Sequence, residues 1–150
     1  MRLAIAALSL LAIPAFAGEP TGGAVPGASV TICAIRQNPT QYVGQVVTVS
    51  ATYSTDSSHY EYLEDPSCNA GNTLDIGFKV PERDASVEEF KAAQAAECRK
   101  TGSRGLCVIE AQVVLRGRIA STTGAHLQPN LTYLVINPHS VLGYSFRAER

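Results

Sequence analysis

The alternation of hydrophobic and polar positions along the chain predicts five β-strands. In segment 46–53, Val47, Val49, Ala51 and Tyr53 alternate with a mostly polar set. A period of two is typical of a strand that buries one face. Segments rich in Ser, Asp, Gly and Pro separate the predicted strands, and these residues favour turns. The predicted strands are 46–53, 59–64, 73–80, 106–120 and 131–136, and Pro138 ends the last one.

Two other segments have the pattern of helices. Segment 30–37 is predicted to be a short helix that has Ser29 as its N-cap and stops at Asn38-Pro39. Segment 86–100 begins with the capping-box sequence Ser-Val-Glu-Glu and carries a narrow apolar stripe through an alanine-rich body. The element order is therefore helix, three strands, helix, two strands.

This order predicts a mainly β fold, a five-stranded OB-like Greek-key barrel with a short leading helix. In such a barrel a helix between the third and fourth strands plugs one end. A β-sandwich is the first alternative, but it usually needs about seven strands and places no capped helix at this point. An α+β sheet with both helices on one face is the second alternative.

The N-terminal segment is predicted to be a secretory signal peptide, residues 1–17. Arg2 precedes an apolar run, and Ala15-Phe16-Ala17 forms a small-x-small cleavage site. The run is too short to span a membrane, and Gly18 rather than Cys follows the cleavage site, so we expect neither a membrane span nor a lipid anchor. Residues 18–28 then form a flexible leader, 29–142 the OB-like domain and 143–150 a C-terminal tail. The expected location is periplasmic or secreted.

Four cysteines lie in the mature chain: Cys33, Cys68, Cys98 and Cys107. Their even number and the oxidising compartment favour disulfide bonds. No C-x-x-C pair occurs, which argues against a zinc ribbon or a thioredoxin-type redox pair. Four cysteines allow three connectivities.

A sequence resemblance covers residues 32–68. The run 38–49, followed by Tyr53, a His-containing segment and the segment 63–68, resembles small exported bacterial proteins that have an OB-like barrel and no assigned activity. The resemblance implies a barrel, export, and a cysteine in the leading helix with another after the second strand. It carries no catalytic residues. We assign structural roles to Tyr42, which is expected to cover the barrel end, and to Gly44, which is expected to turn the chain at positive φ.

The resemblance also bears on the disulfide pairing. A helix end and the next strand start place Cys98 and Cys107 on either side of a turn, within reach of the roughly 5.5 Å Cα spacing that a bridge needs. That pairing leaves Cys33 with Cys68, the pair that recurs in the family-like half. We therefore favour Cys33–Cys68 and Cys98–Cys107.

Charge and chemistry exclude several functions. The chain has 12 basic and 13 acidic residues and a net charge of -1, so it lacks the basic excess that nucleic-acid binding needs. Segment 143–147 has only half of a nucleophile elbow. His59 with Glu61, Glu64 and Asp65 lacks a two-histidine helix motif, and we interpret it as a solvated strand face. We predict no catalytic residue, metal site or cofactor.

Binding is the function that these exclusions leave. OB barrels usually bind ligands around the second and third strands, where Tyr60 and Tyr62 alternate. If Leu63 points inward, both tyrosines are exposed; if the tyrosines are in the core, His59 and Glu61 are outside. The sequence leaves both registers open.

A second candidate contact is the pair Arg116 and Arg118, which share one face of the fourth predicted strand and suit an acidic partner. We therefore expect an exported, non-catalytic binding or envelope-accessory domain whose partner is a protein or small ligand of the cell envelope. The alternative is a small secreted hydrolase, or a protein inhibitor of an envelope enzyme.

Overall fold

The computed structural model describes residues 29–68, 73–78, 81, 83–100, 106–123 and 132–147. The predicted signal peptide, the leader 18–28 and residues 148–150 lie outside these ranges. No helix within them is long and apolar enough to cross a membrane. The elements are α1 (Ile32–Gln37), α2 (Pro39–Tyr42), β1 (Val46–Thr55), β2 (Glu61–Glu64), β3 (Thr73–Ile76), α3 (Ala85–Lys100), β4 (Ile109–Thr123) and β5 (Thr132–Phe146).

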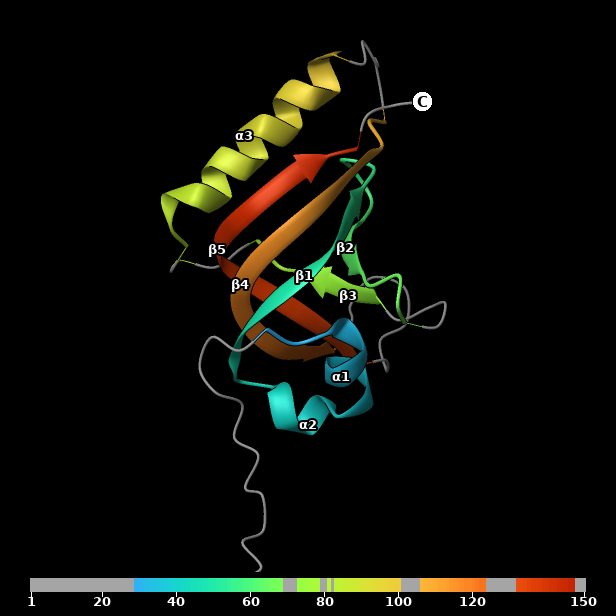
Figure 1. The fold of residues 1–150 in the computed structure, drawn as a ribbon, viewed down its shortest axis with the longest axis vertical. Helices are drawn as coiled ribbons and strands as arrows, with labels where there is room; N and C mark the ends of the chain where they lie inside the picture. Colours follow the sequence, from blue (N-terminus) through green and yellow to red (C-terminus); the bar gives the residue numbers. More distant parts are fainter. Residues whose placement is uncertain are drawn as a thin grey trace, which may run out of the picture.

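The five strands form a closed barrel in the order β1-β2-β3-β5-β4 (Figure 1). The β3–β5 pair is parallel, and the other pairs are antiparallel. A short helix precedes the barrel and α3 connects β3 to β4, so the predicted mainly β, five-stranded OB-like barrel is confirmed. In Figure 1, α3 lies along β5 near one end of the barrel, and α1 and α2 lie near the other end.

The barrel core comes from the inward faces of the strands and from one side of each flanking helix. The alternation in 46–53 is confirmed, because Val47, Val49, Ala51 and Tyr53 are all buried. Helices α1 and α3 add further apolar side chains to the same cluster, and Tyr42 of α2 is also buried there. The helix contributions are Ile32, Ile35, Val87 and Phe90.

Gly44 makes the turn from α2 into β1. Its φ is 86°, a left-handed conformation that favours glycine, as expected. Its N–H donates to the carbonyl of Ile119 at 2.8 Å, and its own carbonyl accepts a hydrogen bond from Arg118 Nη1 at 2.6 Å. The turn is thereby attached to β4.

Both predicted N-caps are wrong by two residues. α1 begins at Ile32, and the Thr31 hydroxyl rather than Ser29 accepts the N–H of Ala34, at 3.1 Å. α3 begins at Ala85, because the Asp84 carboxylate accepts the N–H of Ser86 at 3.0 Å. In each helix, a side-chain oxygen of the residue directly before the first helical residue accepts an unpaired N–H group of the first turn.

The predicted ends of several strands are also wrong. β1 runs two residues further, to Thr55; β2 begins two residues later, at Glu61; and β4 is shifted to Ile109–Thr123. Residues 79 and 80 of the predicted third strand lie outside the described ranges. These differences arise because strand ends depend on pairing with neighbouring strands as well as on alternation.

β5 shows the largest difference, since it continues through Pro138 to Phe146. Residues 143–146, expected in a tail, are therefore part of the barrel sheet. Pro138 is tolerated because it lies at an irregular part of the β4–β5 pairing, opposite Gly117. The aromatic end of the strand is held by packing, because Phe146 stacks on Phe90 of α3 with ring centroids 6.2 Å apart.

Candidate ligand-binding face

The tertiary structure decides the register of β2 that the sequence left open. Leu63 is fully buried and lies opposite Tyr53 of β1 and Leu74 of β3. Tyr62 is opposite Asp75 on the outer face of the barrel, and Tyr60 is 40% exposed. The two tyrosine rings contact each other with centroids 5.3 Å apart and planes tilted by 34°. We call Tyr60 and Tyr62 the tyrosine platform.

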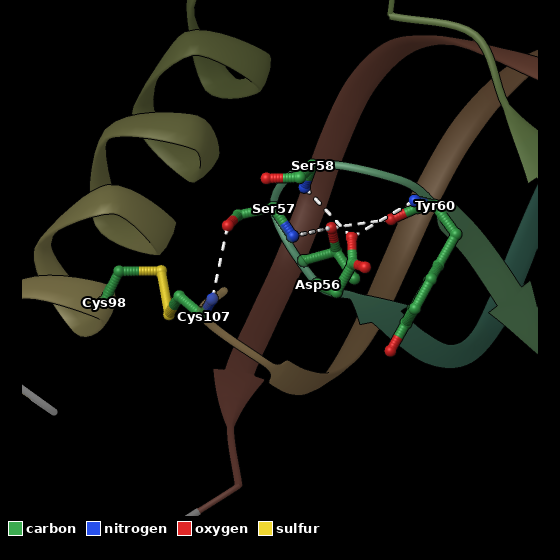
Figure 2. The surroundings of a disulfide bond; sticks show 7 residues. Asp56, Ser57, Ser58, Tyr60, Cys98 and Cys107 are labelled. Carbon is green, nitrogen blue, oxygen red and sulfur yellow. Dashed lines mark hydrogen bonds between the residues drawn. A yellow bond between two sulfur atoms is a disulfide. The ribbon is translucent and has the colours of Figure 1, made fainter. Parts of the chain in front are cut away.

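The loop before the platform is organised by one carboxylate (Figure 2). Asp56 Oδ1 accepts the backbone N–H groups of Ser58 and Tyr60 at 3.0 and 3.2 Å. It also accepts the backbone N–H of His59 at 2.6 Å. Its Oδ2 lies 2.7 Å from Nδ1 of His59. Thr55 Oγ1 donates to the carbonyl of Tyr60 at 2.8 Å, so both backbone polar groups of Tyr60 are held.

These contacts perturb two ionisable groups. Burial acts to raise the pKa of Asp56, but the N–H donors of His59, Ser58 and Tyr60 outweigh it and hold that pKa well below its usual value. Burial, followed by the negative charge of Asp56, raises the pKa of Tyr60. At neutral pH the loop is therefore built around an ionised aspartate, and the Tyr60 phenol keeps its proton.

A disulfide bond also supports this loop. Cys98 at the end of α3 is bonded to Cys107, with Cα atoms 5.7 Å apart. The N–H of Cys107 donates to Ser57 Oγ at 3.4 Å (Figure 2). Ser57 has a φ of 66°, which is uncommon for a residue other than glycine. The second bridge joins Cys33 to Cys68 with a Cα spacing of 5.6 Å, so both pairs are those favoured from the sequence.

The residue between the two tyrosines faces the opposite way. Glu61 Oε1 accepts the hydroxyl of Tyr53 at 3.3 Å and lies 3.8 Å from Nζ of Lys91 on α3. Burial and the charge of Glu61 raise the pKa of Tyr53. Beneath the platform, β2 is thus attached to the barrel core and to α3.

This arrangement corrects the interpretation of the acidic segment as one solvated strand face. Glu61 points inward, and Asp65 is 9% exposed and accepts hydrogen bonds from the N–H and hydroxyl of Ser67. Only Glu64 and His59 are exposed. The alternation failed here because β2 is four residues long and the chain turns immediately on either side of it.

Carboxylates surround the platform. Asp75 of β3 lies beside Tyr62, and its residue surface is exposed. Partial desolvation of its carboxylate by neighbouring atoms nevertheless raises its pKa, and the positive charge of Arg36 opposes that shift. Glu64 follows Tyr62 on the outer face of β2. Glu110 of β4 contributes negative charge near Tyr60 and forms an ion pair with Arg147 at 2.5 Å.

Arg116 and Arg118 lie elsewhere on the barrel. Both are exposed, and they pair with Thr48 and Val46 near the start of β1. Arg116 is six residues from Glu110 along β4, which corresponds to about 20 Å. Arg118 also donates to Gly44, as described above. The structure therefore brings Tyr60 and Tyr62 together but separates them from the two arginines.

Two groups of residues carry features of catalytic or metal sites. The Asp56 carboxylate contacts the His59 ring as in catalytic triads, but among the described residues no serine hydroxyl is hydrogen-bonded to that ring, and Ser57 Oγ accepts the N–H of Cys107 instead. Cys33, Asp65 and Cys68 lie close enough to share a metal ion, but the two sulfur atoms are joined in a disulfide and offer no thiolate. The second group therefore offers no thiolate ligand.

A groove of about 800 Å³ lies on another part of the surface, between the two short helices, the end of β4 and the start of β5. The sequence did not indicate it, because its walls come from segments far apart in the chain. The described lining residues are Arg36, Gln37, Pro39, Thr40, Val43, Ser121 and Leu134.

No protein-family model, curated protein or solved structure matches this chain.

Proposed function

We propose that this protein is an exported, non-catalytic binding domain that holds its ligand on the tyrosine platform. One observation carries this proposal: two tyrosine rings in mutual contact, Tyr60 just before β2 and Tyr62 within it, lie on the outer side of the strand around which OB barrels usually bind their ligands. An exposed pair of aromatic rings offers a large apolar contact area at a low cost in side-chain entropy.

The surroundings of the platform support a binding role because they hold it in place before a ligand arrives. Asp56 and Thr55 hold the backbone of Tyr60, and the Cys98–Cys107 bridge anchors the loop to α3. Glu61 attaches the intervening position of β2 to the core. Ordering a loop on binding costs free energy, so a platform that is already ordered binds more tightly.

The proposed location and partner follow from the same features. Two disulfide bonds are compatible with an oxidising compartment and thus with the predicted export to the periplasm or beyond. The resemblance to small exported OB-like proteins supports the same location. The carboxylates around the platform disfavour a nucleic acid, whose phosphates need clustered lysine or arginine residues. The proposed partner is a protein or small ligand of the cell envelope.

The test is a ligand screen on the mature chain, monitored by ¹H–¹⁵N NMR, with basic, acidic and neutral peptides and oligosaccharides. Ligand-dependent shifts should cluster at Tyr60 and Tyr62, and the double variant Tyr60→Ala/Tyr62→Ala should abolish them. Tyr133→Ala removes a half-buried tyrosine of β5 and is the matched control, which should leave binding unchanged. A ligand that binds the double variant as tightly as the wild type would refute the proposal.

A further inference from the structure

The charges around the tyrosine platform are unbalanced. Among the residues that the structure describes, four carboxylates lie near it: Asp56, Glu64, Asp75 and Glu110. Asp56 accepts hydrogen bonds from backbone N–H groups of its own loop, and Glu110 forms an ion pair with Arg147. The remaining two, Glu64 and Asp75, have no ion-pair partner within the ranges that the structure describes.

Asp75 is the better placed of these two carboxylates. It lies directly opposite Tyr62 in the β2–β3 pair, and side chains at such positions have Cβ atoms about 4.5–5.5 Å apart. Arg36 of α1 is near enough to lower the pKa of Asp75 but forms no ion pair with it in the described part of the chain. The half-buried ring of Tyr62, on the outer face of the barrel, is thus flanked by a carboxylate that has an unused acceptor capacity.

Among polar ligands, a guanidinium matches this combination best. It is planar and stacks on aromatic faces, and it donates two parallel hydrogen bonds to a carboxylate. A lysine ammonium pairs with the carboxylate but does not stack in the same way. A neutral sugar uses the rings but leaves the charge of Asp75 and Glu64 uncompensated, and a polyanion is repelled by both.

We infer that the platform binds an arginine side chain presented by a basic segment of a partner protein, with the guanidinium stacked on Tyr60 and Tyr62 and paired with Asp75. This inference rests on the proposed function and specifies the chemistry of its ligand. Glu64, next along the outer face of β2, accepts a second basic residue of the same segment.

The experiment uses the mature chain and two synthetic peptides, acetyl-Gly-Arg-Gly-Arg-Gly-amide and its analogue with citrulline in place of both arginines. Citrulline keeps the shape of the side chain and removes its charge. NMR titration at low ionic strength measures both dissociation constants. The arginine peptide should shift the Tyr60, Tyr62 and Asp75 amides and bind about tenfold more tightly than the citrulline peptide.

Asp75→Asn should weaken binding of the arginine peptide about tenfold, since a charge-assisted pair is lost. Glu89→Gln is the matched control, because it removes one carboxylate from an exposed site on α3 and changes the net charge equally. An equal loss in both variants would overturn the assignment to the platform and indicate attraction by net charge alone.

Other outcomes separate this inference from the proposed function. Equal binding of the two peptides at the platform, or binding there of chitotriose but of neither peptide, would overturn the cationic ligand and leave the platform as a binding site. Shifts confined to residues away from Tyr60 and Tyr62 would overturn the inference. If, in addition, no ligand responds to Tyr60→Ala/Tyr62→Ala, the proposed function fails as well.

Discussion

Loss of the Cys33–Cys68 bridge should destabilise the protein more than loss of Cys98–Cys107. The first bridge joins residues 35 positions apart, and the second joins residues 9 positions apart. In the chain-entropy model, a cross-link lowers the entropy of the unfolded chain more when the closed loop is longer. The model gives about 3.8 kcal/mol for the longer loop and about 2.6 kcal/mol for the shorter one, a difference of about 1.2 kcal/mol.

The measurement compares Cys33→Ala/Cys68→Ala with Cys98→Ala/Cys107→Ala in denaturant unfolding followed by far-UV circular dichroism, because the chain has no tryptophan. Each variant loses two sulfur atoms, so the two variants remove the same number of side-chain atoms. Reduced wild type is the control that keeps every side chain. A larger loss of unfolding free energy in the Cys98–Cys107 variant would show that loop length does not govern these bridges.

The two double variants should also differ in the hydrogen exchange of the loop before the platform, and here the loss of Cys98–Cys107 should have the larger effect. Only the loss of the Cys98–Cys107 bond releases Cys107, whose N–H donates to Ser57 Oγ. Hydrogen exchange of the Ser58, His59 and Tyr60 amides should therefore accelerate in Cys98→Ala/Cys107→Ala more than in the other variant. Unchanged exchange of these amides would contradict the role assigned to the bridge.

Further changes test the turn, the barrel, the loop and export. Gly44→Ala should cost about 1–2 kcal/mol through its positive φ alone, since the space around it is open. Gly117→Ala should cost about 1–3 kcal/mol, because its Cβ would meet backbone atoms of Asn137, whereas Gly143→Ala, which meets nothing, should be nearly neutral; thermal unfolding compares all three. The lowered pKa of Asp56 means that its contribution is present above the ordinary value of 3.8 and is lost as the pH falls below it. Asp56→Asn should therefore unfold with a weaker acid dependence than the wild type, and an identical pH profile would contradict this. Intact-mass analysis of exported protein should show a chain that begins at Gly18, and a mature species that retains Met1 would contradict the predicted processing.

Local patterns predicted the barrel because burial on one face of a strand produces alternation that a single segment displays. Segment 46–53 shows this: all four of its apolar inward positions are in the core. The pairing of Cys98 with Cys107 was predicted in a similar way, since the two residues are only 9 positions apart in the sequence. The positive φ of Gly44 was predicted from its position between a helix and a strand alone.

The same reasoning failed where distant segments determine the local structure. Pro138 ends a strand when only its neighbours are considered, but β5 continues because Gly117 of β4 allows an irregular pairing opposite it. Beyond that point, Phe146 is held by Phe90 of α3. Asp84 replaces Ser86 as the cap of α3, and the Ser86 hydroxyl instead accepts the N–H of Val141 at 2.8 Å.

The sequence by itself determined the number of strands, the inward face of strands such as β1 and the order of the predicted elements, because these follow from short-range periodicity and turn chemistry. Only the tertiary structure decided which of the candidate residues lie together on the outer face of the barrel. Tyr60 and Tyr62 face outward because Leu63 packs between residues of β1 and β3, and Arg116 and Arg118 are remote because β4 pairs with β1 along its length. A strand of four residues has two faces of similar polarity, and its neighbours in space determine which face the core takes.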